Sequence, residues 1–263
     1  MHGRDARFFD GVVCDLDGVV YRGQEPVAGA AQAIERLRRR GTRVLFCTNN
    51  STPTVEDCRS ALRRVGVDAA ADDILTSAVV AGETLARRGR RGARALVVGE
   101  AGLRESIAAA GLALDDGDER SGDVVVVGLD RGFTYAAMRR ALQWLRAGAE
   151  FVATNTDATF PAPGGVVWPG AGAIVASLIE CSGRHPEVMG KPHAPMMDAA
   201  ERRLAGAQRV AIVGDRPETD LAGGAAKGWT TVLVLTGVTS RAEAAKARPR
   251  PDVVLDGLGA LEP

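Results

Sequence analysis

The chain has 263 residues, and 46% of them are hydrophobic, so it can bury one large core or two smaller ones. Its 33 basic residues balance its 33 acidic residues. This neutrality excludes a global field that would recruit nucleic acid or an anionic membrane, so we expect neither partner, and any function based on charge must be local.

The predicted elements alternate along the whole chain between short apolar runs and segments of helical period. The apolar, mostly β-branched runs predict strands at 11–15, 43–48, 94–98, 123–128, 150–154, 209–214 and 231–235. The segments of helical period predict helices at 28–40, 54–65, 101–110, 134–147, 171–182, 194–204 and 219–227. Continuous apolar strands separated by helices are typical of a parallel sheet that is covered on both faces. The sequence therefore predicts an α/β fold.

Two breaks divide the chain into a split domain and an insertion. The basic, glycine-punctuated stretch ARRGRRGAR at 86–94 indicates an exposed connection, and the turn-rich SGRHP at 182–186 is a second break. Three predicted strands lie between them. We therefore predict an inserted α/β domain at 82–185, with 1–81 and 186–263 together forming the other domain.

The run VVCDLDGVVYRG at 12–23 ends a predicted strand with two carboxylates, Asp15 and Asp17. Buried like charges at this separation are costly unless a counter-charge offsets them. Four more polar residues occupy comparable positions at the ends of predicted strands or before a predicted helix: Thr48, Asn49, Lys191 and Asp215. Because ligands of open parallel sheets bind at the carboxyl ends of the strands, we expect these groups to meet.

Such a set suits a divalent cation and a phosphoryl group. Mg²⁺ prefers oxygen ligands, which the carboxylates of Asp15 and Asp215 can supply. A phosphoryl group in transfer is stabilised by cations and by N–H or O–H donors, which Lys191 and Thr48 offer. One carboxylate of the pair Asp15 and Asp17 can attack phosphorus, and the other can protonate the leaving oxygen and later activate water.

Each of these features also has a purely structural interpretation. Asp15 and Asp17 could be turn residues after a strand, and the segment TNN at 48–50 could cap a helix. Asp220 could stabilise the N-terminus of the helix at 219–227 through the helix dipole. The occurrence of all the groups in one ordered set favours catalysis.

The motifs DLDGV, TNN, GKP and GDRxxTD occur in this order and together resemble the haloacid dehalogenase-like phosphohydrolases. Three longer segments resemble the 4-nitrophenylphosphatase and NagD-type subgroup: VVVGLDRGFTYAAM at 125–138, FVATNTDATFP at 151–161 and VLVLTGVTS at 232–240. The resemblance covers nearly the whole chain. It implies a Rossmann-like core with a large α/β cap that is inserted between TNN and GKP and sets substrate specificity.

The resemblance implies a role for each matching residue of the core. Asp15 would be the nucleophile, and Asp17 would be the general acid and base. Thr48 and Asn49 would bind the transferring phosphoryl group, and Lys191 would neutralise its charge. The resemblance thus assigns the attack on phosphorus to Asp15 and the proton transfers to Asp17.

The resemblance also implies the metal site and its surroundings. Mg²⁺ would bind the carboxylates of Asp15 and Asp215 and the backbone carbonyl of Asp17. Asp220 would orient Lys191 or the waters bound to the metal. These residues come from segments that are far apart in the sequence, so the metal site requires the fold to bring them together.

In the inserted domain, Asn155 and Asp157 are candidates for substrate or phosphate binding, because the resemblance places their ATNTD segment near the cleft. Two positions depart from the family pattern. Pro217-Glu218 adds a carboxylate close to the metal site, and His193 stands where a helix-capping Ser is frequent. Neither departure replaces a residue with an implied catalytic role.

We therefore predict a Mg²⁺-dependent phosphatase that acts on small phosphorylated metabolites through an aspartyl-phosphate. Aromatic residues make up 4% of the chain, so an obvious platform for stacking a base is lacking, which favours a small aliphatic phosphate such as glycerol phosphate or phosphoglycolate. The alternatives are a nucleotide monophosphate or pyridoxal phosphate as substrate, or a phosphotransferase or a non-catalytic phosphate-binding module on the same scaffold. Asp17 argues against a dehalogenase, and the lack of GxGxxG after the first strand argues against a dinucleotide oxidoreductase.

The cysteines and the N-terminal sequence favour a cytoplasmic location. Cys14, Cys47, Cys58 and Cys181 have no metal-ligand spacing, and reduced thiols are typical of cytosolic proteins. The first ten residues lack the apolar segment of a signal peptide, and no apolar stretch approaches the length of a membrane span. A homodimer through the cap is compatible with the resemblance, but the residues do not decide it.

Overall fold

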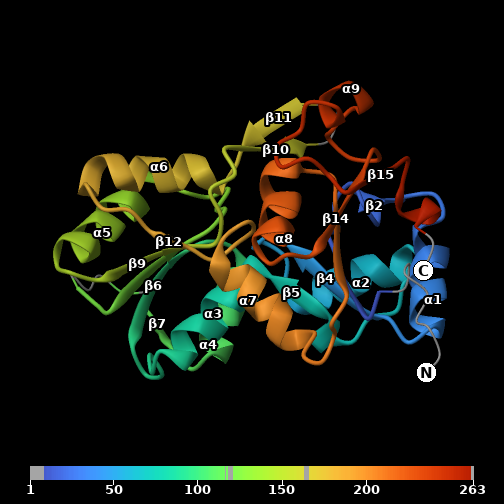
Figure 1. Cartoon of the computed structure of the whole chain (residues 1–263). Coiled ribbons are helices and arrows are strands. Elements are labelled where there is room, and N and C mark those ends of the chain that lie inside the picture. The colour runs from blue at the N-terminus through green and yellow to red at the C-terminus, as the bar shows by residue number, and fades with distance from the viewer. Residues whose placement is uncertain (1–8, 116, 118–120, 163–165, 262–263) are drawn as a thin grey trace. The chain divides into compact units, whose positions relative to one another are not determined.

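The computed structural model describes residues 9–115, 117, 121–162 and 166–261. The contacts within it divide the chain into two compact units. The first unit contains Met1–Thr48, Glu56–Leu75 and Lys191–Pro263, and the second contains Asn49–Val55 and Thr76–Gly190. Figure 1 shows the helices and strands of both units, coloured along the chain.

The first unit is built on a six-stranded sheet with the strand order β15-β14-β13-β1-β4-β5. Its strands are β1 (Gly11–Cys14), β4 (Arg43–Thr48), β5 (Ile74–Thr76), β13 (Val210–Gly214), β14 (Thr230–Val234) and β15 (Val253–Leu255). The neighbours from β4 to β15 pair in parallel. Every residue of β1 and β13 is buried, which explains why both strands are continuous apolar runs rather than alternating ones.

The register of this sheet places the ends of three strands at one edge. β1 lies between β4 and β13, with Cys14 opposite Val213. The Asp15 amide continues the ladder by donating to the Val213 carbonyl at 2.9 Å. Asp15, Thr48 and Asp215 therefore all lie at the carboxyl-terminal edge of the sheet.

The first unit also contains helices and a small hairpin. They are α1 (Ala30–Arg39), α2 (Val55–Arg64), α7 (Ala194–Arg203), α8 (Ala222–Ala226), α9 (Arg241–Ala244), η1 (Ala71–Asp73), η3 (Pro217–Leu221), η4 (Leu258–Ala260), β2 (Tyr21–Arg22) and β3 (Glu25–Pro26). The buried residues of α1 recur every three or four positions: Ala30, Ala33, Ile34 and Leu37. Burial of a side chain the size of Ile34 or Leu37 contributes about 1.5–3 kcal/mol, so this apolar stripe holds the helix in place.

The second unit has its own parallel sheet, with the strand order β12-β9-β8-β6-β7. Its elements are α3 (Ser77–Arg87), β6 (Arg94–Val98), α4 (Ala101–Ala109), β7 (Ala113–Leu114), β8 (Val124–Val127), α5 (Tyr135–Arg146), β9 (Glu150–Ala153), α6 (Ala171–Ser182) and β12 (Glu187–Val188). α5 and α6 lie side by side (Figure 1) and enclose the fully buried Trp144 in an apolar core with the sheet. A separate antiparallel hairpin consists of β10 (Thr159–Ala162) and β11 (Val166–Pro169).

The predicted α/β class is confirmed, because both units have parallel sheets with helical connections. The limits of the two units differ from the predicted domain limits. The insertion was expected at 82–185, whereas the second unit runs from 76 to 190 and also includes 49–55. The exposed basic stretch 86–94 joins α3 to β6 within the second unit, so it does not mark the boundary.

Close packing explains why α3 and the segment 49–55 belong to the second unit. α3 packs against α4 where Gly82 faces the backbone of Ser106. At the start of α4, the Gly102 amide donates to the Thr52 carbonyl at 2.9 Å. None of the helices in the described part of the chain is long and apolar enough to cross a membrane.

Candidate active site

A buried lysine bridges two carboxylates at the carboxyl-terminal edge of the first sheet. Lys191 Nζ donates to Asp15 Oδ1 and to Asp220 Oδ1, each at 2.6 Å, and to the Cys47 carbonyl at 2.9 Å. The Lys191 side chain is only 3% exposed. A buried charge is tolerated only when partners satisfy it, and here three acceptors surround an ammonium with three donors.

Each of these acceptors is fixed by local structure. Asp15 follows β1, Cys47 lies in β4, and Asp220 lies in η3. The second carboxylate oxygen of Asp220 accepts from the Arg216 amide at 3.1 Å. Because both of its oxygens are engaged, Asp220 is poorly placed to bind a cation and well placed to orient Lys191.

Asp215 brings a buried oxygen without a donor to the same edge. It follows β13, and its Oδ2 accepts from the Val238 amide at 2.7 Å. Its Oδ1 is buried and has no hydrogen-bond partner among the described residues. An unsatisfied buried acceptor is costly, and a cation would satisfy it.

The charges of this cluster fit a divalent cation. Asp15, Asp215 and Asp220 each place one carboxylate oxygen within 4.8 Å of the others. Three ionised carboxylates and the Lys191 ammonium sum to −2, since three negative charges meet one positive charge. Mg²⁺ binds a few protein oxygens and completes its coordination with water and phosphate, so the free oxygens of Asp15 and Asp215 would hold such an ion.

The pKa values of the cluster reflect the burial of its carboxylates and the repulsion between them. Burial raises the pKa of Asp15, with contributions from Asp220 and Asp215, against the opposing effect of Lys191. Burial and the Asp220 charge raise the pKa of Asp215 to about 6, although the Val238 amide opposes the shift. Burial would lower the pKa of Lys191, but its two carboxylate partners raise it, so the ammonium stays charged. A cation beside Asp15 and Asp215 would offset their repulsion.

Asp17 lies at the same edge, but its carboxylate is outside this cluster. It occupies the turn after β1, in which the Gly18 amide donates to the Tyr21 carbonyl at 2.8 Å. Its side chain reaches solvent. Desolvation by the surrounding protein nevertheless raises the pKa of Asp17, against the opposing charges of Lys191 and Arg216.

The remaining candidate residues fall into different units. Thr48 is buried at the end of β4 in the first unit. The other three lie in the second unit, where Asp157 Oδ2 accepts from Asn49 Nδ2 at 3.2 Å and from Asn155 Nδ2 at 2.7 Å. The structure therefore forms two groups of candidate residues: the carboxylate cluster around Lys191 in the first unit, and Asn49, Asn155 and Asp157 in the second.

Several contacts of the site come from backbone groups that the sequence analysis did not identify. They are the carbonyl of Cys47 and the amides of Arg216 and Val238. Every residue type offers these groups, so the residue letters carry no signal for them. Val238 lies in the VLVLTGVTS segment, which the resemblance marked without giving it a role.

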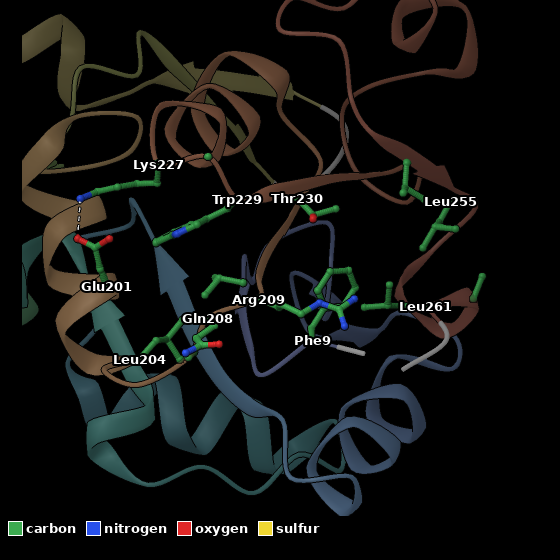
Figure 2. A pocket seen from close by; sticks show the side chains of 15 residues that line it. Phe9, Glu201, Leu204, Gln208, Arg209, Lys227, Trp229, Thr230, Leu255 and Leu261 are labelled. Carbon is green, nitrogen blue, oxygen red and sulfur yellow. Dashed lines mark hydrogen bonds and ion pairs between the residues drawn. The ribbon is translucent and has the colours of Figure 1, made fainter. Parts of the chain in front are cut away.

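A pocket of about 800 Å³ lies at the opposite edge of the first sheet (Figure 2). Its lining includes Val210 and Thr230, the residues at which β13 and β14 begin. Its lining mixes apolar side chains such as Trp229 with polar ones such as Arg209, and Lys227 donates to Glu201. None of the candidate site residues lines this pocket, so the chemistry belongs to the carboxylate edge.

Comparisons with known proteins agree with this site. A family model described as haloacid dehalogenase-like hydrolase matches residues 12–113, and a second HAD-hydrolase-like model matches residues 188–261. The D-glycerol 3-phosphate phosphatase of Mycobacterium tuberculosis is 38% identical over 259 residues, which cover 97% of this chain and 72% of the relative. A 5'-nucleotidase of Bacillus subtilis is 33% identical over 251 residues, which cover 95% of this chain and 96% of the relative.

Solved structures give the same result. The p-nitrophenyl phosphatase from Archaeoglobus fulgidus has a TM-score of 0.88 at 34% identity, covering 96% of this chain and 97% of that one. A glycerol phosphate phosphatase from Mycobacterium tuberculosis in complex with magnesium has a TM-score of 0.89 at 37% identity, covering 97% of this chain and 76% of that one. The chain therefore belongs to the haloacid dehalogenase-like hydrolase family. Within this family it is a phosphatase of the 4-nitrophenylphosphatase and NagD-type subgroup.

Proposed function

We propose that this protein is a Mg²⁺-dependent phosphatase that hydrolyses small phosphomonoesters through a phosphoryl group carried on Asp15. The observation that supports this proposal most strongly is the buried carboxylate cluster. In it, Lys191 holds one oxygen of Asp15, and the buried Oδ1 of Asp215 lacks a donor among the described residues. The magnesium complex of the related glycerol phosphate phosphatase supports the choice of metal.

In the first half-reaction, an oxygen of Asp15 forms a bond to phosphorus while the bond from phosphorus to the leaving oxygen breaks. Lys191, which is hydrogen bonded to Asp15, neutralises charge on the transferring group. Asp17 donates a proton to the leaving oxygen, and its raised pKa suits it to this task. When bound, Mg²⁺ would offset the negative charge of the carboxylates and of the phosphoryl group.

In the second half-reaction, Asp17 is a carboxylate and takes a proton from water. The water oxygen attacks phosphorus, the bond between phosphorus and Asp15 breaks, and inorganic phosphate leaves. Asp17 then holds a proton again and Asp15 is a free carboxylate, so the cycle is closed. Two displacements at one site allow the leaving group to vary.

The preferred substrate class is a small aliphatic phosphate such as glycerol phosphate or phosphoglycolate. The low aromatic content of the chain supports this choice, as does the name of the Mycobacterium tuberculosis relative. The second unit would act as the specificity cap, with Asn155 and Asp157 as candidate contacts. A homodimer through this unit stays a prediction. The four free cysteines support the cytoplasm as the location.

A nucleotide monophosphate is a second candidate substrate, and one side chain favours it. Trp168 of β11 is 45% exposed and meets Phe160 of β10 edge to face, with ring centroids 6.0 Å apart. Its free face offers a stacking surface that the low aromatic content of the sequence did not suggest. The 5'-nucleotidase of Bacillus subtilis is a relative that fits this alternative.

Two substitutions test the mechanism. Asp15→Asn removes the nucleophile and keeps the shape, so we expect turnover of 4-nitrophenyl phosphate to fall by at least about 10³-fold while the circular dichroism spectrum stays unchanged. Asp17→Asn should slow both the burst of alcohol release and the later release of phosphate, because one group serves both steps. Substantial turnover by Asp15→Asn would remove the nucleophile assignment, and a defect in only one step of Asp17→Asn would contradict the dual role.

A substrate panel separates the remaining alternatives. The kcat/KM values should rank glycerol phosphate or phosphoglycolate above nucleotide monophosphates and pyridoxal phosphate. If nucleotides lead, Trp168→Leu should lower their kcat/KM selectively, and the aliphatic preference is wrong. Added sugars or alcohols should leave the yield of free phosphate unchanged, whereas a phosphotransferase would divert phosphate to the acceptor.

A further inference from the structure

The loop that follows β14, residues 236–239, holds Asp215 from one side. We call it the β14 loop. The Val238 amide donates to Asp215 Oδ2 at 2.7 Å, and Thr239 Oγ1 donates to the Asp215 carbonyl at 2.5 Å. Gly237 lies so close that a Cβ atom there would overlap Asp215 Oδ2. Since Oδ2 is engaged by the loop, Oδ1 is the Asp215 oxygen left to face a cation.

The β14 loop also holds the turn that follows β1. Thr236 Oγ1 donates to the Gly18 carbonyl at 2.6 Å, and Arg22 in β2 donates through Nε to the Thr236 carbonyl. Gly18 has a φ of 81°, and a Cβ atom on it would lie 2.8 Å from the Gly237 Cα. Only glycine adopts this conformation readily and allows so close an approach. The turn that carries Asp17 is therefore in close contact with the β14 loop through Gly18.

We propose that the β14 loop positions the metal site, and that the hydroxyls of Thr236 and Thr239 hold the loop in place for this. One loop spans the two segments that carry Asp17 and Asp215, so it fixes the gap in which a cation would bind. Hydrogen-bond partners of metal ligands orient those ligands, and their loss lowers metal affinity by about 10–100-fold. The inference rests on the proposed Mg²⁺ site and adds residues that do not contact the metal.

The test measures Mg²⁺ affinity by calorimetry, without substrate, so that the readout does not depend on turnover. Thr239→Val and Thr236→Val each remove one hydroxyl and keep the side-chain shape. Each should weaken Mg²⁺ binding by about tenfold, with kcat at saturating Mg²⁺ close to that of the parent protein. Thr239→Ser and Thr236→Ser keep the hydroxyl and should restore the affinity, which a loss of packing alone would not predict.

Thr42→Val is the matched control. Thr42 is 3% exposed, and its hydroxyl donates to the Phe9 carbonyl at 2.8 Å just before β4, at the edge of the sheet away from the carboxylates. Its substitution should lower thermal stability and leave Mg²⁺ affinity unchanged. A comparable loss of affinity in Thr42→Val would show that any buried hydroxyl has this effect, and the inference would be wrong.

Asp215→Asn separates this inference from the proposed function. If Asp215→Asn loses Mg²⁺ binding while both valine variants bind normally, the loop does not position the site and the proposed function stands. If Asp215→Asn binds Mg²⁺ like the parent protein, the proposed metal site itself is wrong. The two valine variants probe the loop independently, so failure of one to fold leaves the other as the test.

Discussion

The two carboxylate oxygens of Asp215 have different surroundings. Its Oδ2 accepts the Val238 amide, and its buried Oδ1 meets no donor among the described residues. A backbone hydrogen bond and burial therefore act in opposite directions on the same group, and burial prevails. The raised pKa of Asp215, about 6, is the measurable result.

The pKa of Asp215 predicts how the metal-free protein responds to pH. Its folded value of about 6 exceeds the ordinary value of 3.8, so the folded protein binds this proton more tightly than the unfolded chain does. The resulting stability is fully present below about pH 4 and is lost as the pH rises through about 6. The shift is worth up to about 3 kcal/mol, since one unit corresponds to about 1.4 kcal/mol.

In chelator at pH 8, Asp215→Asn should therefore be more stable than the parent protein, and the difference should shrink toward pH 4. Urea unfolding at several pH values measures the two free energies of unfolding. Asp198→Asn is the control, because Asp198 is half exposed and pairs with Lys227 at the surface. A parent protein that is more stable than Asp215→Asn at pH 8 would show that the ionised Asp215 carboxylate does not destabilise the metal-free fold.

The side chains of the site were largely predictable from the sequence, and its backbone contacts were not. Asp15 and Asp215 follow apolar strands, so their place at one sheet edge follows from the fold class alone. The amide of Val238 has no counterpart in the residue letters, because every residue except proline has one. Asp157 was predicted as a ligand of substrate or phosphate, and the structure shows its carboxylate accepting from two amides within the second unit.

Among the elements, the apolar strands of four or more residues in the two parallel sheets were predictable, whereas the two-residue strands and the mostly buried helix α3 were not. β2, β3, β7 and β12 have two residues each, and such short strands form only because a neighbour pairs with them. α3 was missed for a different reason. Seven of its eleven residues are buried, so it lacks the polar face that would reveal a helical period.

Gly82 in α3 provides a prediction in which two effects oppose each other. Replacing a helical glycine by alanine ordinarily gains about 1 kcal/mol from helix propensity. Here the added Cβ would lie 2.5 Å from the carbonyl oxygen of Ser106 in α4 and 3.2 Å from the Cβ of Ala110, which follows α4. Overpacking against backbone costs about 1–3 kcal/mol, so we expect Gly82→Ala to lower the free energy of unfolding.

Thermal and urea unfolding of Gly82→Ala measure this balance. Ala108→Gly is the matched control, because Ala108 is exposed in α4 and reports the propensity effect alone, with an expected loss of about 1 kcal/mol. A stabilised Gly82→Ala protein would show that α3 and α4 can separate at little cost. In that case their packing would not explain why α3 belongs to the second unit.

At the scale of the whole molecule, the carboxylate cluster belongs to one of the two units. Asp15, Lys191, Asp215 and Asp220 all lie in the first unit, although 176 positions separate Asp15 from Lys191 in the sequence. Metal binding should therefore act on one unit directly. The second unit has its own sheet and its own apolar core around Trp144.

Hydrogen exchange with and without Mg²⁺, in the absence of substrate, tests this separation. Binding of a ligand to the folded state stabilises it by about 2.7 kcal/mol at one hundred times its Kd. We expect slower exchange at residues 15–18, 215–220 and 236–239 and no change in β8 and β9. Slower exchange throughout the second sheet would show that the metal acts on both units.

The position of the pocket in Figure 2 has a practical consequence. Phe9 and Leu261 both line it, so the first and last parts of the described chain come together there, on the sheet edge away from the carboxylates. Neighbouring ends of this kind suit circular permutation, in which a short linker joins them and the chain is reopened elsewhere. A support attached beside this pocket would likewise face the sheet edge that lies away from the carboxylates.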